Sequence, residues 1–156
     1  MGPTGPQGAQ GLEGPTGPQG TIPDDVFASF VDLQGRYTNG MVLPLFPSVI
    51  DDTGNIVSSN DERIILAPGY YLISYQVSAT FSEPNYMQIT PFYNGMAHLE
   101  YDIYFATSAD GSSACGSAYL ILRAPQQTEF FLTFSSSGTA LNGQLTLTVL
   151  KLRKPL

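Results

Sequence analysis

The side chains most able to take part in catalysis in this 156-residue chain are a single histidine and a single cysteine. His98 is followed closely by Glu100 and Asp102, so a serine-histidine-aspartate arrangement can be written down. The sequence places neither a serine nor Cys115 beside this histidine. We therefore expect no catalytic residues and no enzymatic activity.

Cys115 cannot form a disulfide within the chain, because it has no second cysteine to pair with. The residues around it, 114 and 116–118, are all small. Small neighbours predict a buried, unreactive thiol. The alternative is a cluster of three symmetry-related cysteines in a trimer.

Metal binding has little support in the sequence. A zinc site needs more cysteine and histidine ligands than this chain contains. Acidic pairs occur at residues 24–25, 51–52 and 61–62, but none belongs to a calcium loop of the Asp-X-Asp-X-Asp-Gly type. Turn formation explains residues 51–55 more simply. We predict no metal site and no cofactor, and the alternative is calcium held by carboxylates of three chains on a shared axis.

Glycine occupies every third position from Gly2 to Gly20, and proline stands only in the X position of these Gly-X-Y triplets. This period is typical of the collagen triple helix, whose crowded axis accepts only glycine. Proline confined to X is what we expect of collagen made without prolyl hydroxylase, as in bacteria or phages. We predict a triple-helical segment over residues 1–20, and hence a homotrimer; the alternative is a flexible tail.

Composition indicates that the rest of the chain folds. Apolar residues make up 42% and aromatic residues 12% of the sequence, and only 12% of residues are charged. The net charge of −7 disfavours nucleic acids and anionic lipid as partners. We expect no membrane insertion, since no apolar stretch is long enough. The triplets follow Met1 directly, so we expect a targeting segment and a longer stalk upstream.

Apolar and polar residues alternate with a period of two through most of residues 26–156, which predicts β-strands. We expect strands over residues 26–33, 64–66, 71–77, 87–93, 117–123, 129–135 and 144–152. Asn94-Gly95 predicts a tight hairpin. The expected domains are therefore a collagen-like segment (1–20), a hinge (21–25) and an all-β, antiparallel jelly-roll sandwich (26–156).

The alternation also separates two faces. The predicted core face carries Tyr71, Ile73, Tyr75, Val77, Phe130, Leu132, Phe134, Leu145, Leu147 and Val149. The opposite face carries Leu72, Ser74, Gln76, Phe131, Thr133, Thr146, Thr148 and Leu150.

Three segments resemble the complement q-subcomponent heads and the tumour necrosis factor superfamily. These are Gly69-X-Tyr71-X-Ile73-X-Tyr75, the strand over residues 116–123 (Gly-Ser-Ala-Tyr-Leu-Ile-Leu-Arg) and the apolar strand over residues 87–94 that runs into Asn-Gly. The likeness spans most of residues 26–152. The sequence departs from the family pattern at Ile73, where phenylalanine is usual, and at residues 126–127, where Gln-Gln replaces Gly-Asp.

This resemblance implies a trimeric jelly roll whose second face lies toward the three-fold axis. On that basis the eight residues of the opposite face would form the trimer contact, and Phe131→Asp would dissociate the trimer. Together with the stalk, the chain resembles the collagen-like glycoproteins of bacterial spore coats and exosporia. The resemblance thus implies a non-enzymatic structural protein at an extracellular, spore-type surface.

An alternative function is recognition of a host protein or a glycan, as in a complement head or a phage tail-fibre tip. Exposed aromatic side chains outside the core would favour it. The candidate ligand surface consists of Tyr86, Tyr101 and Tyr104.

Overall fold

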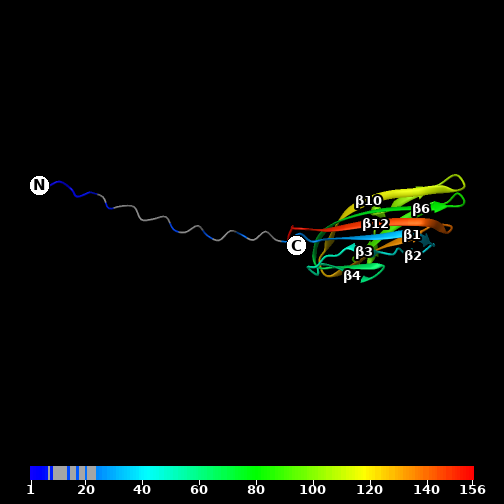
Figure 1. The fold of residues 1–156 in the computed structure, drawn as a ribbon, viewed down its shortest axis with the longest axis horizontal. Helices are drawn as coiled ribbons and strands as arrows, with labels where there is room; N and C mark the ends of the chain where they lie inside the picture. Colours follow the sequence, from blue (N-terminus) through cyan, green and yellow to red (C-terminus); the bar gives the residue numbers. More distant parts are fainter. Residues whose placement is uncertain (7, 9–13, 15–16, 18–19, 21–23) are drawn as a thin grey trace.

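The computed structural model describes residues 1–6, 8, 14, 17, 20 and 24–156. Most of the predicted collagen-like triplets and of the predicted hinge over residues 21–25 therefore lie outside the described residues. Residues 24–156 form two antiparallel sheets, of five and seven strands, which face each other across one hydrophobic core (Figure 1). The prediction of an antiparallel jelly-roll sandwich is confirmed.

The five-stranded sheet, called sheet A below, contains the long strands. Its order is β10 (Ser112–Ala124), β6 (Gly69–Phe81), β12 (Ala140–Leu152), β1 (Phe27–Tyr37) and β3 (Phe46–Val49).

The seven-stranded sheet, sheet B, is built from shorter strands. Its main path is β4 (Ile56–Asn60), β5 (Arg63–Leu66), β11 (Thr128–Ser135), β7 (Tyr86–Tyr93) and β8 (Met96–Ala97). Strand β2 (Met41–Val42) also pairs with β11, and β9 (Ile103–Ala106) also pairs with β7. A single 3₁₀ turn, η1 (Leu99–Tyr101), connects β8 to β9.

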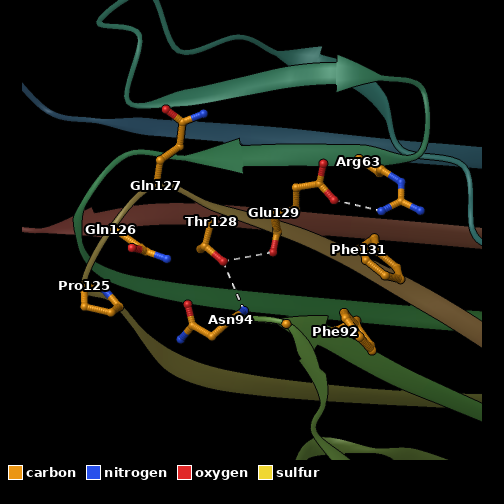
Figure 2. A pocket seen from close by; sticks show the side chains of 10 residues that line it. Arg63, Phe92, Asn94, Pro125, Gln126, Gln127, Thr128, Glu129 and Phe131 are labelled. Carbon is orange, nitrogen blue, oxygen red and sulfur yellow. Dashed lines mark hydrogen bonds and ion pairs between the residues drawn. The ribbon is translucent and has the colours of Figure 1, made fainter.

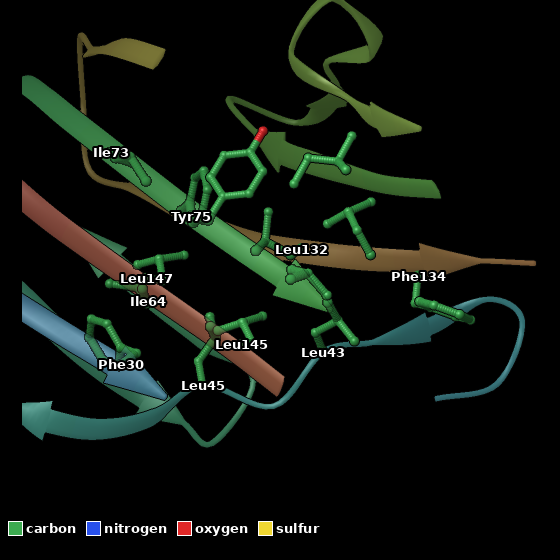
Figure 3. Packing of buried hydrophobic residues seen from close by; sticks show 14 of the residues in the cluster. Phe30, Leu43, Leu45, Ile64, Ile73, Tyr75, Leu132, Phe134, Leu145 and Leu147 are labelled. Atoms are coloured by element: carbon green, nitrogen blue, oxygen red, sulfur yellow. The ribbon is translucent and has the colours of Figure 1, made fainter. Parts of the chain in front are cut away.

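The inward faces of the two sheets form the core (Figure 3). Every residue predicted for the core is buried, because each occupies an alternate position of β6, β11 or β12. Leu43 and Leu45, between β2 and β3, are fully buried and complete the core. Removal of this apolar surface from water is the main stabilising contribution to the fold.

The sequence prediction missed β2, β3, β4, β8 and β9. These strands have two to five residues, too few for a period of two to stand out. Pro47 in β3 is a residue that weakens a strand prediction, and the end of β4 is a polar Ser-Ser-Asn run. Strands β2, β3 and β9 are determined by pairing with β11, β1 and β7, which are distant in sequence, and local sequence cannot show it. Strands β4 and β8 instead pair with β5 and β7 across short turns.

A buried tyrosine packs the C-terminal end of β1 against β12. The Tyr37 hydroxyl donates a 2.9 Å hydrogen bond to the buried Asp32 carboxylate, and burial raises the pKa of this tyrosine above its ordinary value. A Cβ at Gly35 or Gly143 would overlap the Tyr37 ring. The β1–β12 register shifts on both sides of Gly35, next to Gln34 with its positive φ of 59°. Glycine at these two positions makes room for the ring.

Asn94 and Gly95 form the predicted tight hairpin. Their φ angles of 50° and 81° both lie in the left-handed region, as a two-residue type I′ turn requires. Tyr93 pairs with Met96 across the turn, so β7 leads directly into β8.

The Asp51 carboxylate organises the loop that leads from β3 in sheet A to β4 in sheet B. It accepts hydrogen bonds from the backbone N–H groups of Thr53, Asn55 and Ile56 at 2.8–3.0 Å, and from the Thr53 hydroxyl. Burial opposes ionisation of the carboxylate, but these hydrogen bonds outweigh it and hold the Asp51 pKa below its ordinary value. Turn formation therefore accounts for this acidic pair, as the sequence suggested.

Candidate interaction surfaces

Six of the eight residues predicted for the trimer contact lie together on the outer face of sheet A. They are adjacent residues of two neighbouring strands, since Leu72 pairs with Leu150, Ser74 with Thr148 and Gln76 with Thr146. All six are exposed or half-buried. The predicted alternation of β6 and β12 is responsible for this arrangement.

Phe131 and Thr133 do not belong to this face, so the prediction that all eight residues share one surface is wrong. Both lie on β11 of sheet B, where Phe131 pairs with Phe92 and Thr133 with Thr90. Their side chains point outward on the opposite side of the sandwich. Alternation within a strand separates inward from outward positions, but it does not reveal which sheet the strand joins.

Strand β10 adds two residues to the sheet A face that the sequence analysis did not assign to it. Tyr119 and Ile121 are 75% and 59% exposed, and they lie opposite Ser74 and Leu72 of β6. Beside Tyr119 is a shallow hollow of about 240 Å³, lined also by Ser74, Gln76, Thr146 and Thr148. If the alternating residues of 117–123 had been assigned to this face, the sequence would have predicted that both side chains lie on it.

The outer face of sheet B carries aromatic residues that are already stacked within the chain. The Arg63 guanidinium lies 4.4 Å from the centre of the Phe131 ring, and Phe131 stacks on Phe92 with 4.8 Å between ring centres. Arg63 also forms a 2.9 Å ion pair with Glu129 (Figure 2). We call Arg63, Phe131 and Phe92 the layered stack.

Two of the three tyrosines predicted for a ligand surface come together. Tyr86 on β7 stacks on Tyr104 of β9, with ring centres 5.7 Å apart and an angle of 19° between the rings. Tyr101 belongs to η1 and packs against the hydrophobic core, where its carbonyl accepts a hydrogen bond from the Tyr75 hydroxyl. The three-residue surface is therefore reduced to the Tyr86–Tyr104 pair.

His98 is held in a structural role. Its Nδ1 lies 2.8 Å from Glu100 Oε1, its Nε2 lies 3.2 Å from the Tyr93 carbonyl oxygen, and its ring stacks on that of Tyr93 at 3.6 Å. The hydrogen bond with His98 lowers the Glu100 pKa. The Asp102 carboxylate accepts a hydrogen bond from Gln88 instead of approaching the histidine. Of the two candidate acids, Glu100 pairs with His98 and Asp102 pairs with Gln88. The Nε2 atom of His98, which a nucleophile would need, lies instead against the Tyr93 carbonyl oxygen.

Cys115 is exposed, so the prediction of a buried thiol is wrong. It alternates with the inward-facing Ala114 on β10 and therefore points outward from sheet A. The small size of the neighbouring residues therefore does not indicate whether the thiol is buried. Among the described residues, no three histidine, cysteine, aspartate or glutamate side chains are close enough together to hold a metal ion.

Both ends of the folded chain lie at the same end of the sandwich (Figure 1). The Lys151 N–H donates a 2.9 Å hydrogen bond to the Val26 carbonyl, and Asp25 forms an ion pair with Arg153. The Lys154 ammonium lies 4.9 Å from the centre of the Tyr70 ring. These contacts attach the segment before β1 to the segment after β12.

Comparison with solved structures identifies the fold. The globular domain of zebrafish complement 1qA protein superposes with a TM-score of 0.61 at 7% identity, over 85% of this chain and 100% of that one. An Eiger TNF from S. frugiperda gives 0.59 at 12% identity, over 85% of this chain and 95% of that one. The PRD1 vertex protein P5 gives 0.53 at 16% identity, over 83% and 97%.

Residues 24–156, called the head below, thus have the jelly-roll fold of the complement 1q and tumour necrosis factor proteins. No protein-family model and no curated protein sequence matches the chain. Within the described part of the chain, no helix is long and apolar enough to cross a membrane.

Proposed function

We propose that this chain is the non-enzymatic head of a homotrimeric, collagen-stalked filament at an extracellular surface, of the kind found on bacterial spores. The head joins three chains through the outer face of sheet A, and the trimer then aligns the Gly-X-Y segments for winding. The proposed contact consists of Leu72, Ser74, Gln76, Thr146, Thr148 and Leu150, with the addition of Tyr119 and Ile121.

The observation that carries this proposal is the exposed apolar surface of sheet A. Tyr119 and Ile121 project from β10, and Leu150 on the same face is 41% exposed. Large apolar side chains gathered on one face favour burial against another protein surface. A cyclic trimer joins two different parts of this face, so a protruding edge and a shallow hollow beside it suit such a contact.

The stalk makes a stable head trimer necessary. Six Gly-X-Y triplets would form a rod of only about 50–60 Å, too short to hold three chains together unaided. Three chains held by their heads have a high effective concentration of triplets. In the head, the Lys151–Val26 hydrogen bond and the exposed Asp25–Arg153 ion pair hold the residues just before β1 against those after β12, which supports this arrangement.

Sedimentation equilibrium of the full chain tests the trimer, and circular dichroism tests the stalk. We expect a mass of three copies at micromolar protein concentration and a collagen-type positive band that melts cooperatively. A stable single copy would contradict the proposal. A three-copy mass without the collagen band would keep the head trimer and reject the triple helix.

A second candidate function is ligand recognition by the head, and the Tyr86–Tyr104 pair favours it. These stacked rings lie on the outer side of sheet B, away from the proposed trimer contact, and Tyr104 is 62% exposed. Exposed, rigid tyrosines are effective contact residues at protein interfaces. A host protein captured by the intact trimer but not by Tyr104→Ala would support this function; equal capture by both would remove the pair from it.

A further inference from the structure

The outer face of sheet B contains a hollow of about 580 Å³ that none of the functions above uses (Figure 2). It lies where β5, β7 and β11 meet the loop between β10 and β11. One wall is the layered stack of Arg63, Phe131 and Phe92, and the other comes from loop residues 125–127. This volume is typical of a small-molecule site.

The wall formed by the layered stack is held together by contacts within the chain. Phe131 is covered by Arg63 and stacked on Phe92, at the distances given above. Glu129 holds the guanidinium from the side, although both side chains of this pair are partly exposed to water, at 34% and 52%. A site with fixed side chains loses little conformational freedom on binding.

The opposite wall is attached to the sheet through Asn94. The Asn94 N–H donates to the Thr128 hydroxyl at 3.1 Å, and its side-chain amide donates to the Arg123 carbonyl at 3.0 Å. The tight turn after β7 is thereby joined to both ends of the loop between β10 and β11. The loop that carries Gln126 and Gln127 is therefore held in place at the edge of the hollow.

The hollow also offers unused hydrogen-bonding groups. The side-chain amides of Gln126 and Gln127 are exposed and have no hydrogen-bond partner among residues 24–156. Each amide supplies two donors and one acceptor oxygen. One Glu129 carboxylate oxygen and the remaining Arg63 N–H groups are likewise not used by hydrogen bonds within residues 24–156.

This combination of groups selects a ligand class. Arg63 and Phe92 cover the two faces of the Phe131 ring, so apolar contact comes from Pro125 and from the parts of the phenylalanine rings that line the hollow. Planar amides and a carboxylate–guanidinium pair provide adjacent donors and acceptors. A pyranose ring presents the matching pattern, with apolar C–H groups on its faces and hydroxyls around its edge. Glu129 compensates the charge of Arg63 and the chain carries a net charge of −7, both of which disfavour an anion. We propose that this hollow binds a neutral pyranose of a glycan.

The site is separate from the sheet A face and from the Tyr86–Tyr104 pair, so it does not depend on the trimer or on the tyrosine surface. Nuclear magnetic resonance of the ¹⁵N-labelled full chain can test it. The probes are the methyl glycosides of glucose, galactose and mannose, with N-acetylneuraminic acid as an anionic comparison. At least one neutral glycoside should give saturable shifts of the Asn94, Gln127 and Thr128 amides, with a dissociation constant of about 1–10 mM for a single sugar.

Two variants locate the site, and a third is the control. Gln126→Ala combined with Gln127→Ala removes only groups without protein partners, so the fold is retained, and we expect about a tenfold loss of affinity. Phe131→Ala should abolish the shifts, and Tyr104→Ala should leave them unchanged. Absence of saturable shifts with all three glycosides, tighter binding of the anion, or unchanged binding by the double glutamine variant would overturn the proposal. Shifts lost only in Tyr104→Ala would also overturn it, and would instead assign sugar binding to the tyrosine pair.

Discussion

The outer faces of the two sheets both expose aromatic residues, but they differ in what covers them. On sheet B, Phe131 is covered by Arg63 and by Phe92 of the same chain. On sheet A, Tyr119 is 75% exposed and has no ring or cation partner within residues 24–156. The exposed aromatic residues of this β-sandwich are therefore not all equivalent. The lack of a partner within the chain is the reason for proposing that Tyr119 contacts another chain.

The largest expected effect comes from charge on the sheet A face. Tyr119→Asp combined with Ile121→Asp should reduce the mass from three copies to one, because an unpaired charge buried at the contact costs about 3–5 kcal/mol. The collagen band should be lost with the trimer. Sedimentation equilibrium and circular dichroism measure the two effects.

Phe131→Asp is the control on the opposite side of the sandwich: it places one negative charge on the sheet B face and is compared with Ile121→Asp alone, which places one on the sheet A face. The Phe131→Asp variant should remain a trimer with an intact collagen band. Dissociation by Phe131→Asp, with no effect of the Tyr119 and Ile121 changes, would assign the contact to sheet B and reverse the comparison.

A smaller effect is expected within sheet A itself, at the close approach of β1 and β12. Gly143→Ala should lower the free energy of unfolding by about 1–3 kcal/mol, because the new Cβ overlaps the buried Tyr37 ring. Denaturant unfolding measures it. Gly143→Ala should cost less when it is made in the Tyr37→Leu variant than when it is made in the original chain, because the ring that the new Cβ overlaps is then absent. An equal cost in both backgrounds would show that the Tyr37 ring is not the source of the strain.

Asp51, in the loop between β3 and β4, should make the free energy of unfolding depend on pH. The pKa of Asp51 is lower in the folded state than in the unfolded chain, so its contribution is present above the unfolded value of about 4 and disappears as the pH falls through the folded value. Asp51→Asn should cost about 1–2 kcal/mol at pH 7 and less at pH 3. Urea unfolding at the two pH values checks this; an equal cost at both would show that the charge of Asp51 is unimportant.

The smallest effect should come from the ion pair beside the layered stack. Arg63→Gln should lower the free energy of unfolding by about 0.5–1 kcal/mol, since exposed ion pairs and cation–π contacts contribute little to folding. Thermal unfolding measures this change. A loss several times larger would mean that the stack supports the fold, which would weaken the difference drawn between the two faces.

The sequence predicted the long strands and their core residues because alternation over seven or more residues is a local property. It could not assign Phe131 to a sheet, since β11 joins sheet B through pairs with residues about 40 positions earlier, such as Phe131 with Phe92. The short strands β2 and β9 also depend on pairing with residues distant in sequence. The exposure of Tyr119 could have been predicted, because it lies in a predicted strand. The outward positions of that strand were not assigned to a face.

Two other residues show where local reasoning misled or could not decide. Cys115 was assigned from the size of its neighbours, although its position in the alternation of β10 places it outside. The aromatic partner of His98 is Tyr93, on the other side of the Asn94-Gly95 turn, so the two rings meet only once that hairpin has formed. The layered stack brings together β5, β7 and β11, and no single segment of sequence contains it.

The position of β1 has a mechanical consequence. This strand is held between β12 and β3, and its pairs with β12 run from Phe27–Leu150 to Tyr37–Ala140. A rod pulled away from a tethered head would load β1 along its own length. The rungs of the β1–β12 ladder would then share the tension, whereas a sideways pull would break them one after another. This geometry would let a head carried on a stalk, as proposed above, withstand drag.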